Sequence, residues 1–250
     1  PVLGMFGTKP FAADVWAERP KITCFCGAVN RLAVEKIVEE FERHEGVEID
    51  DVYNGCGMLT GNMKLINEQR TDLGFPDVYM ACDVYYLENV KQWFQEAQIV
   101  SETDMVIAVP KGSDKVQSLE DLLKPGVRVA IGQSEHCPIG ALTRRMLTAG
   151  GFYDRLIEKQ KTFGEVVAIG TDTTPADVAI AYETDAKANA DRVDIIHIDS
   201  PHTKAVQPFA ISRTSMQKHL GRRLYQRIAR SPEVFEAAGF RPRSGEFDTG

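Results

Sequence analysis

The sequence predicts an α/β protein of two lobes, with one lobe inserted into the other and a hinge of two crossing strands between them. Short apolar runs alternate with helix-like periods along most of the 250 residues. A second α/β series begins after Ser113, and a long apolar segment at 204–212 then returns towards the first series. The expected parts are an N-terminal arm or linker over residues 1–20, lobe 1 over 21–104 and 206–250, and lobe 2 over 105–205.

Composition and charge limit the function classes. Hydrophobic residues make up 43% and charged residues 26% of the chain, which is ordinary for a globular protein in water. The formal net charge of −7 argues against nucleic acid or an anionic membrane as the main partner. No apolar run approaches the roughly 18 residues that a membrane span needs. The sequence starts at Pro1 without an apolar leader, so we expect any signal peptide or membrane tether upstream of it.

Lobe 1 is expected to alternate strands and helices. The strand segments are rich in β-favouring apolar residues, and the helix segments place apolar residues near a 3.6-residue period. This order implies parallel strands with right-handed crossovers. The expected strands are 21–26, 46–53 and 76–81, and the expected helices start at Asn30 or cover 58–68 and 84–96.

Lobe 2 is expected to open with a longer strand at 103–113 and a short helix capped by Ser118. The strands near Val106 and Phe209 would form the hinge. In open sheets of this kind the ligand lies beyond the carboxyl ends of the strands, which draws attention to the strand-to-helix loops. The remaining expected strands are 127–132, 176–182, 193–198 and 204–212, with helices at 139–149, 216–230 and 232–238.

Four strand-to-helix loops carry one cysteine each, which is the most informative pattern in the chain. The loops read "FCGAVN", "YNGCGML", "ACDVYY" and "SEHCPIGA", and their cysteines are Cys26, Cys56, Cys82 and Cys137. The fifth cysteine, Cys24, falls inside a strand and is expected in the core. An odd number of cysteines does not suggest a purely disulfide framework.

The order and spacing of these motifs resemble the periplasmic molybdate/tungstate-binding proteins of ABC importers, over about residues 21–240. The resemblance implies a type II solute-binding fold that closes on a tetrahedral oxyanion held by hydroxyls and backbone amides. It also implies a periplasmic or extracytoplasmic location and a permease partner. Tyr182 matches a tyrosine that points at the anion in that family. The matching stretches include "VEKIVEEFERHEGVEIDDVYNGCGMLTGNMK", "GFPDVYMACD", "VAIAYETDA" and "VFEAAGFRP".

The sequence departs from the family pattern at the cysteines. Cys56 stands where the glycine-rich loop of the family usually offers Ser. Cys82 lies in Ala81-Cys82-Asp83, which resembles a "Ser-Ala-Asp" signature, and Cys137 replaces a small apolar residue. The loop around Cys26 matches only loosely.

Three interpretations of the cysteines stay open. Free cysteines often fill space in the core. A disulfide within one lobe, such as Cys26 to Cys56, suits an oxidising compartment, whereas a bridge to Cys137 would tie the lobes shut. The third interpretation is a thiolate site for a soft metal such as Zn or Cu, or for an iron–sulfur cluster.

Size and charge favour a [4Fe–4S] cluster within the third interpretation. A pocket for a tetraoxyanion holds its donors one metal–oxygen bond plus a hydrogen bond of about 2.8 Å from the centre, whereas a lone Zn needs sulfurs at about 2.3 Å. An anionic cluster also suits helix N-termini. The leading hypothesis is therefore an extracytoplasmic solute-binding domain, not an enzyme, whose cluster would deliver, sense or transfer electrons to a redox partner.

The expected site residues follow from that hypothesis, and two alternatives to it remain. One alternative is capture of molybdate or tungstate for an ABC permease. The other is a cysteine-dependent enzyme, which would need a base that the sequence does not reveal. The expected metal ligands are Cys26, Cys56, Cys82 and Cys137, and the secondary ligand-binding residues are Gly55, Gly57, His136 and Tyr182.

Overall fold

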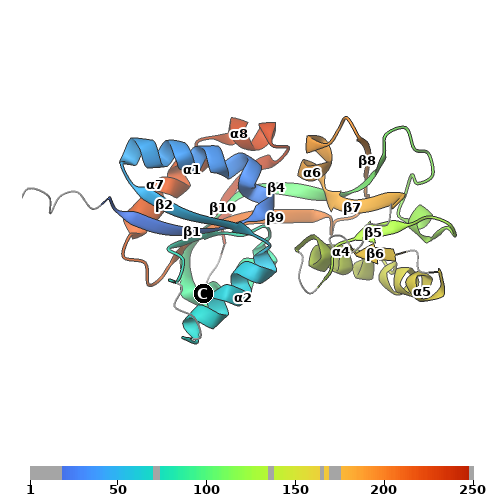
Figure 1. Ribbon diagram of the computed structural model, residues 1–250, viewed down its shortest axis with the longest axis horizontal. Coiled ribbons are helices and arrows are strands. Elements are labelled where there is room, and N and C mark those ends of the chain that lie inside the picture. Colours follow the sequence, from blue (N-terminus) through green and yellow to red (C-terminus); the bar gives the residue numbers. More distant parts are fainter. Residues whose placement is uncertain (1–18, 70–73, 135–137, 164–165, 169–175, 248–250) are drawn as a thin grey trace, which may run out of the picture.

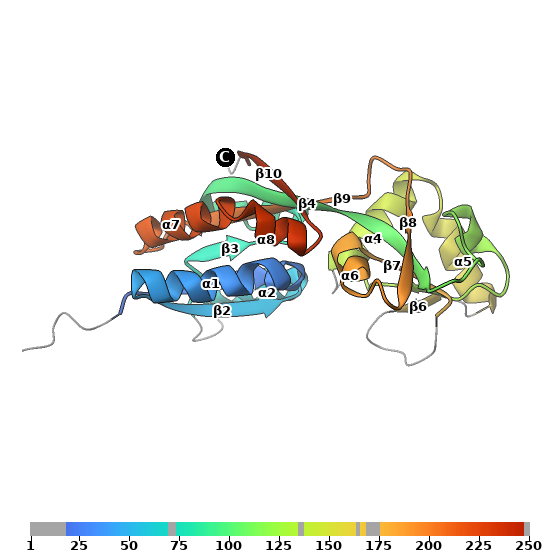
Figure 2. The same ribbon diagram turned by 90° about the horizontal axis from the view of Figure 1, so that it is seen from above.

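Two lobes lie end to end along the longest axis of the protein (Figure 1). A computed structural model describes residues 19–69, 74–134, 138–163, 166–168 and 176–247. Strand β4 (Phe94–Pro110) runs from one lobe into the other, and β9 (Lys204–Ser212) leads back beside it (Figures 1 and 2). The two strands pair antiparallel from Phe94 opposite Ser212 to Asp104 opposite Lys204. The predicted two-lobed α/β fold with a hinge of two strands is confirmed.

The sheet of lobe 1 combines three parallel strands with the hinge pair. Its order is β2-β1-β3-β9-β4, with β10 added to the outer edge of β4. Strands β1, β2 and β3 run parallel, so their carboxyl ends meet at one edge, which faces the hinge. The bounds are β1 (Lys21–Gly27), β2 (Glu48–Asn54), β3 (Val78–Met80) and β10 (Arg241–Glu246).

Helices cover both faces of this sheet because side chains on successive strand residues point to opposite faces. One face packs against α1 (Arg31–Glu45), α7 (Lys218–Ala229) and α8 (Pro232–Ala237). The other face packs against α2 (Cys56–Asn67) and α3 (Val84–Glu88). Each face has its own buried core.

Lobe 2 repeats the arrangement on a smaller scale. Its parallel strands are β5 (Val129–Ile131), β6 (Val166–Ala168) and β7 (Val178–Tyr182), while β4 and β8 (Val193–His197) run antiparallel. The main core lies under α4 (Pro138–Ala149) and α5 (Tyr153–Phe163), and α6 (Glu183–Ala188) covers the opposite face. Across the described ranges, every helix is too short or too polar to cross a membrane.

Two sequence predictions, one in each lobe, are wrong in detail. The helix expected over 84–96 ends at Glu88, because Phe94 already pairs with Ser212 in the hinge sheet and buries its ring there. Ser118 does not cap a helix; the turn Glu120–Leu123 is a 3₁₀ helix. The Asp121 carboxylate instead accepts a hydrogen bond of 2.7 Å from the backbone N–H of Gln117.

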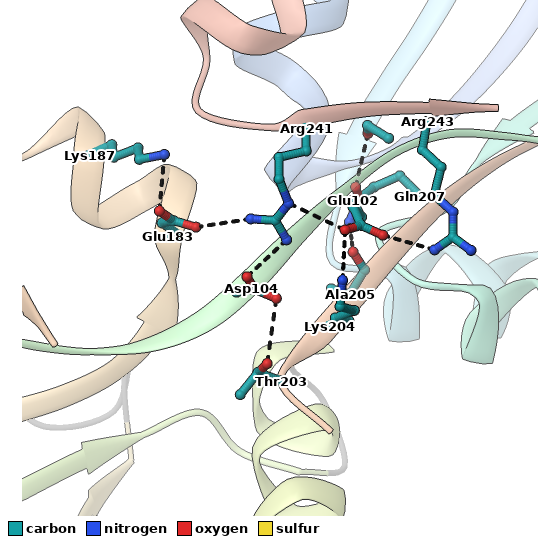
Figure 3. A network of polar contacts seen from close by, with 11 residues as sticks. Glu102, Asp104, Glu183, Lys187, Thr203, Lys204, Ala205, Gln207, Arg241 and Arg243 are labelled. Atoms are coloured by element: carbon teal, nitrogen blue, oxygen red, sulfur yellow. Dashed lines mark hydrogen bonds and ion pairs between the residues drawn. The ribbon is translucent and has the colours of Figure 1, made fainter. Parts of the chain in front are cut away.

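An ion-pair network joins the C-terminal strand to both lobes (Figure 3). The Arg241 guanidinium of β10 lies 2.8 Å from the Asp104 carboxylate and 3.3 Å from that of Glu102, both on β4. The same guanidinium lies 3.5 Å from the carboxylate of Glu183 in lobe 2, which also pairs with Lys187 at 3.0 Å. Arg241 therefore bridges the lobes beside the hinge.

Candidate functional site

Three strand-end loops of lobe 1 meet at one point. Gly27 closes β1, Cys56 begins α2 and Cys82 follows β3. A Cβ atom placed on Gly27 would lie 2.7 Å from the Cys56 sulfur and 2.9 Å from the backbone nitrogen of Cys82. Only glycine fits between these loops without displacing one of them, so their convergence is a built feature of the fold.

The second loop presents the start of α2. Gly55 is the N-cap, and no side chain caps the helix. The Asn54 side chain accepts a 2.7 Å hydrogen bond from the N–H of Gly55, which orders the turn one residue earlier. The first-turn N–H groups of a helix have no partner within the helix, and the helix dipole is positive there. The groups around Gly57 are therefore suited to an anion.

Cys56 and Cys82 form a disulfide, with their Cα atoms 6.4 Å apart. Both residues are buried, and the Cys82 N–H also donates a 3.1 Å hydrogen bond to the Cys56 sulfur. A bridge within one lobe was one of the open interpretations, but it joins Cys56 to Cys82 rather than to Cys26. In this bonded state neither sulfur is a free thiolate.

Cys26 lies away from this pair, on the other face of β1. Its side chain packs with that of Cys24 in the core under α1, whereas Phe25 points towards the disulfide. Burial raises the pKa of the Cys24 thiol to about 12, and it raises the pKa of the Cys26 thiol well above its ordinary value. Cys26 is thus a buried neutral thiol and not a cleft ligand in this structure, because β1 continues as a regular strand to Gly27.

The cluster hypothesis receives no support from these positions. Cys137 and His136 lie outside the described residues. Within the described part of the chain, no three His, Cys, Asp or Glu side chains are grouped so that they could hold a metal ion. The described cysteines also offer no exposed, readily ionised thiol of the kind that a nucleophilic enzyme needs.

The third loop is fastened to the hinge through Asp83. Its carboxylate caps α3 by accepting from the Tyr85 N–H at 2.9 Å, and it also accepts from the Val206 N–H of β9 at 3.0 Å. Burial raises the pKa of the Asp83 carboxyl, while these two donors and Arg145 act in the opposite direction. Arg145 belongs to α4 of lobe 2, and its guanidinium lies 3.9 Å from the carboxylate.

Two buried amides complete the site, and the sequence analysis did not single out either of them. Asn30 donates to the Ala81 carbonyl at 3.2 Å and so ties the first loop to the third. Gln207 of β9 donates to the Cys82 carbonyl at 3.1 Å. Asn30 had a signal in the sequence as the polar residue before α1, but Gln207 lies in an apolar strand whose neighbours could not be inferred.

Lobe 2 contributes Tyr182, which ends β7 and takes the N-cap position of α6. Its side chain is buried in the lobe 2 core with Ile180 and Met105. The residue stands at the carboxyl end of a strand, on the edge where ligands of such sheets bind.

The fold and these loops define a two-lobed solute-binding protein. The chain belongs to the bacterial extracellular solute-binding protein family, which matches residues 22–241.

Relatives and solved structures agree with that assignment. The molybdate-binding protein ModA of Mycobacterium tuberculosis H37Rv is 23% identical over 227 residues, covering 88% of this chain and 84% of that protein. The Azotobacter vinelandii periplasmic molybdate-binding protein superposes with a TM-score of 0.63 at 16% identity, covering 87% of this chain and 98% of that one. The sulfate-binding protein SubI of Mycobacterium tuberculosis gives a TM-score of 0.65 at 18% identity, covering 90% and 87%. At these identities the structural likeness establishes the fold.

Proposed function

We propose that this protein is the extracytoplasmic binding component of an ABC importer and that it captures a tetrahedral oxyanion of the molybdate or tungstate type. The ligand would lie between the lobes, against the first turn of α2. Gly55 and Gly57 would provide close backbone approach, and Tyr182 would complete the site from lobe 2. The partner would be a membrane permease that receives the anion from the cleft.

The observation that carries this proposal is the uncapped start of α2 at the meeting point of three strand-end loops. Gly55 leaves the helix without a side-chain cap, and the sulfurs of Cys56 and Cys82 are joined in a neutral disulfide. Backbone N–H donors at the positive end of a helix can bind an anion without a cationic side chain. The relatives named for molybdate and the neighbour named for sulfate bind tetrahedral oxyanions, which have the same shape.

Thermal stabilisation tests the proposal. Purified protein is melted with sodium molybdate, tungstate, sulfate or phosphate, each against sodium chloride at equal ionic strength. Ligand at about 100 times its Kd stabilises the native state by about 2.7 kcal/mol, which raises Tm by roughly 5–11 °C in a protein of this size. We expect that rise for molybdate and tungstate. No rise with any of the four oxyanions would contradict oxyanion capture.

A matched pair of tyrosine variants tests the lobe 2 contact. Tyr182→Phe removes a hydroxyl at the proposed site, and Tyr225→Phe removes one from α7, on the far side of the lobe 1 sheet from α2. We expect calorimetric Kd for molybdate to rise about tenfold in Tyr182→Phe, in line with one hydrogen bond to a charged group, and to stay unchanged in Tyr225→Phe. Equal affinities would remove Tyr182 from the site.

A further inference from the structure

We propose that the Cys56–Cys82 disulfide is a positioning element of the oxyanion site, which couples the first turn of α2 to the hinge strands. This inference rests on the proposed function, because it concerns the same site. The bridge acts on the ligand through the backbone donors that it holds in place. It also makes a competent site a property of the oxidised protein.

The first step is the position of Cys56. It is the first residue of α2, and its sulfur fills the space left by the missing side chain of Gly27. The Cys82 N–H donates to that same sulfur at 3.1 Å. The bridge therefore fixes the start of α2 against the ends of β1 and β3 at once.

The second step leads from Cys82 to both hinge strands. The Cys82 carbonyl accepts from the Gln207 amide of β9 at 3.1 Å, and the same amide group accepts from the Ser101 hydroxyl of β4 at 2.9 Å. The next residue, Asp83, accepts from the Val206 N–H at 3.0 Å. The side chains in this set are all buried, namely those of Cys82, Asp83, Ser101 and Gln207. A continuous set of buried contacts thus runs from the first turn of α2, through the disulfide, to the hinge strands.

The third step is what the loop would lose without the bridge. Cys56 lies between Gly55 and Gly57, and glycine has the widest backbone freedom of any residue. Donors that must be ordered at the moment of binding cost affinity, whereas donors already held in place do not. The bridge also prevents either sulfur from becoming a thiolate that would repel the anion. Such a bridge persists in an oxidising, extracytoplasmic setting.

Calorimetry compares the bridged protein with two unbridged forms. One is Cys56→Ser/Cys82→Ser, and the other is wild type reduced with dithiothreitol. In the second form the bridge takes up two electrons and two protons, giving two thiols and the cyclic disulfide of the reagent. We expect molybdate affinity to fall roughly tenfold or more in both forms, because preorganised donors are lost. All titrations run well below the measured Tm of each form.

Cys24→Ala is the matched control, since it removes a buried thiol and keeps the bridge. It should bind molybdate as wild type does. If the double variant does not fold, reduced wild type provides the comparison. Folded unbridged protein that binds as tightly as wild type would overturn the proposal, since the bridge would then serve only as a staple for stability.

Hydrogen exchange gives a second readout that does not depend on a ligand. Loss of the bridge should speed exchange in peptides covering 55–60 and also in those covering the hinge segment 204–208. Faster exchange confined to 55–60 would overturn the coupling. A wild type that binds no oxyanion would contradict the proposed function, and the exchange data alone would then decide whether the bridge couples loop and hinge.

Discussion

Gly27 shows how one residue position governs the contact between three loops. A side chain there would overlap the Cys56 sulfur and the Cys82 backbone nitrogen. Because Cys56 and Cys82 are joined by the disulfide, moving either of them would displace the other. At Gly61, in the second turn of α2, an added Cβ atom would meet open space. The two glycines therefore form a natural pair for comparison.

Gly27→Ala should destabilise the protein by about 1–3 kcal/mol, which is the usual cost of an extra methyl in a packed region. Gly61→Ala should stabilise it by about 0.5–1 kcal/mol, because alanine is the better residue in a helix interior. Urea unfolding followed by circular dichroism measures both. Equal effects of the same sign would show that the loops do not pack as described.

Asp83 should give the protein a pH-dependent stability of defined sign. Burial raises the pKa of this carboxyl above its ordinary value of 3.8. The folded state then holds the proton at pH values where the unfolded state has released it, so the contribution of Asp83 to stability is full below the unfolded pKa and is lost as pH rises through the folded pKa. The unfolding free energy of wild type minus that of Asp83→Asn should therefore fall as pH rises above 3.8.

Asp194 provides the opposite sign as a control. Hydrogen bonding to Lys111 and to the Gly112 N–H lowers the pKa of its carboxyl. Its contribution to stability is present above the ordinary pKa and is lost as pH falls through the folded one. Denaturant titrations of Asp83→Asn and Asp194→Asn over the same pH series should thus diverge in opposite directions. Parallel trends would contradict the burial of Asp83.

At the scale of elements, the sequence predicted those whose core face is apolar and periodic. Strand β9 was predicted with its observed bounds, because eight of its nine residues are at least partly buried. Strand β10 was not predicted, since its residues are mostly exposed and it is held by ion pairs to β4 rather than by a hydrophobic face. Helix α6 was also missed, since its buried residues are Glu183, Thr184 and Ala186, which do not form an apolar face.

The candidate site followed the same rule. Parallel strands place their carboxyl ends together, so the convergence of the loops around Gly55, Cys56 and Cys82 could be inferred from the order of elements. The partner of Cys56 could not, because it depends on the residue at which β1 ends. The strand was predicted to end at Cys26, but β1 continues to Gly27. Cys26 therefore points into the core under α1, and Gly27 faces the bridge. Alternation of side chains makes such a single-residue difference decisive.

The network around β10 predicts unequal effects for two neighbouring arginines. Arg241 contacts three carboxylates on β4 and α6, whereas Arg243 forms its ion pair, among the described residues, with Glu102 (Figure 3). Arg243→Gln should cost about 0.2–1 kcal/mol, as exposed ion pairs do. Arg241→Gln should cost more, because it leaves Glu183, which is largely buried, with Lys187 as its remaining ion-pair partner.

Calorimetric melting and hydrogen exchange test this difference. Both arginine side chains are about half exposed, so charge screening should shrink both effects in high salt. In Arg241→Gln, exchange should also speed up in α6, on the other side of the hinge. Identical melting and exchange in the two variants would show that Arg241 does not couple the lobes.

At the scale of the whole molecule, the described residues connect the lobes through two strands, the Arg241 network and the ion pair of Arg145 with Asp83. So few connections allow the lobes to move relative to each other as units. An oxyanion held by donors from both lobes would favour the closed arrangement over the open one. Small-angle X-ray scattering should show a smaller radius of gyration with saturating molybdate than with chloride. An unchanged radius in protein that binds molybdate by calorimetry would place the ligand on one lobe only.

The pairing of β4 with β9 also has a consequence for protein engineering. The chain leaves lobe 1 after Asp104 and re-enters it at Lys204, and these two residues face each other as cross-strand partners. Joining them through a two-residue turn would convert the hinge into an ordinary β-hairpin. The shortened gene, without the segment for lobe 2, would then encode lobe 1 as a small domain that keeps the disulfide and the start of α2. This domain would allow half of the proposed binding site to be studied by itself.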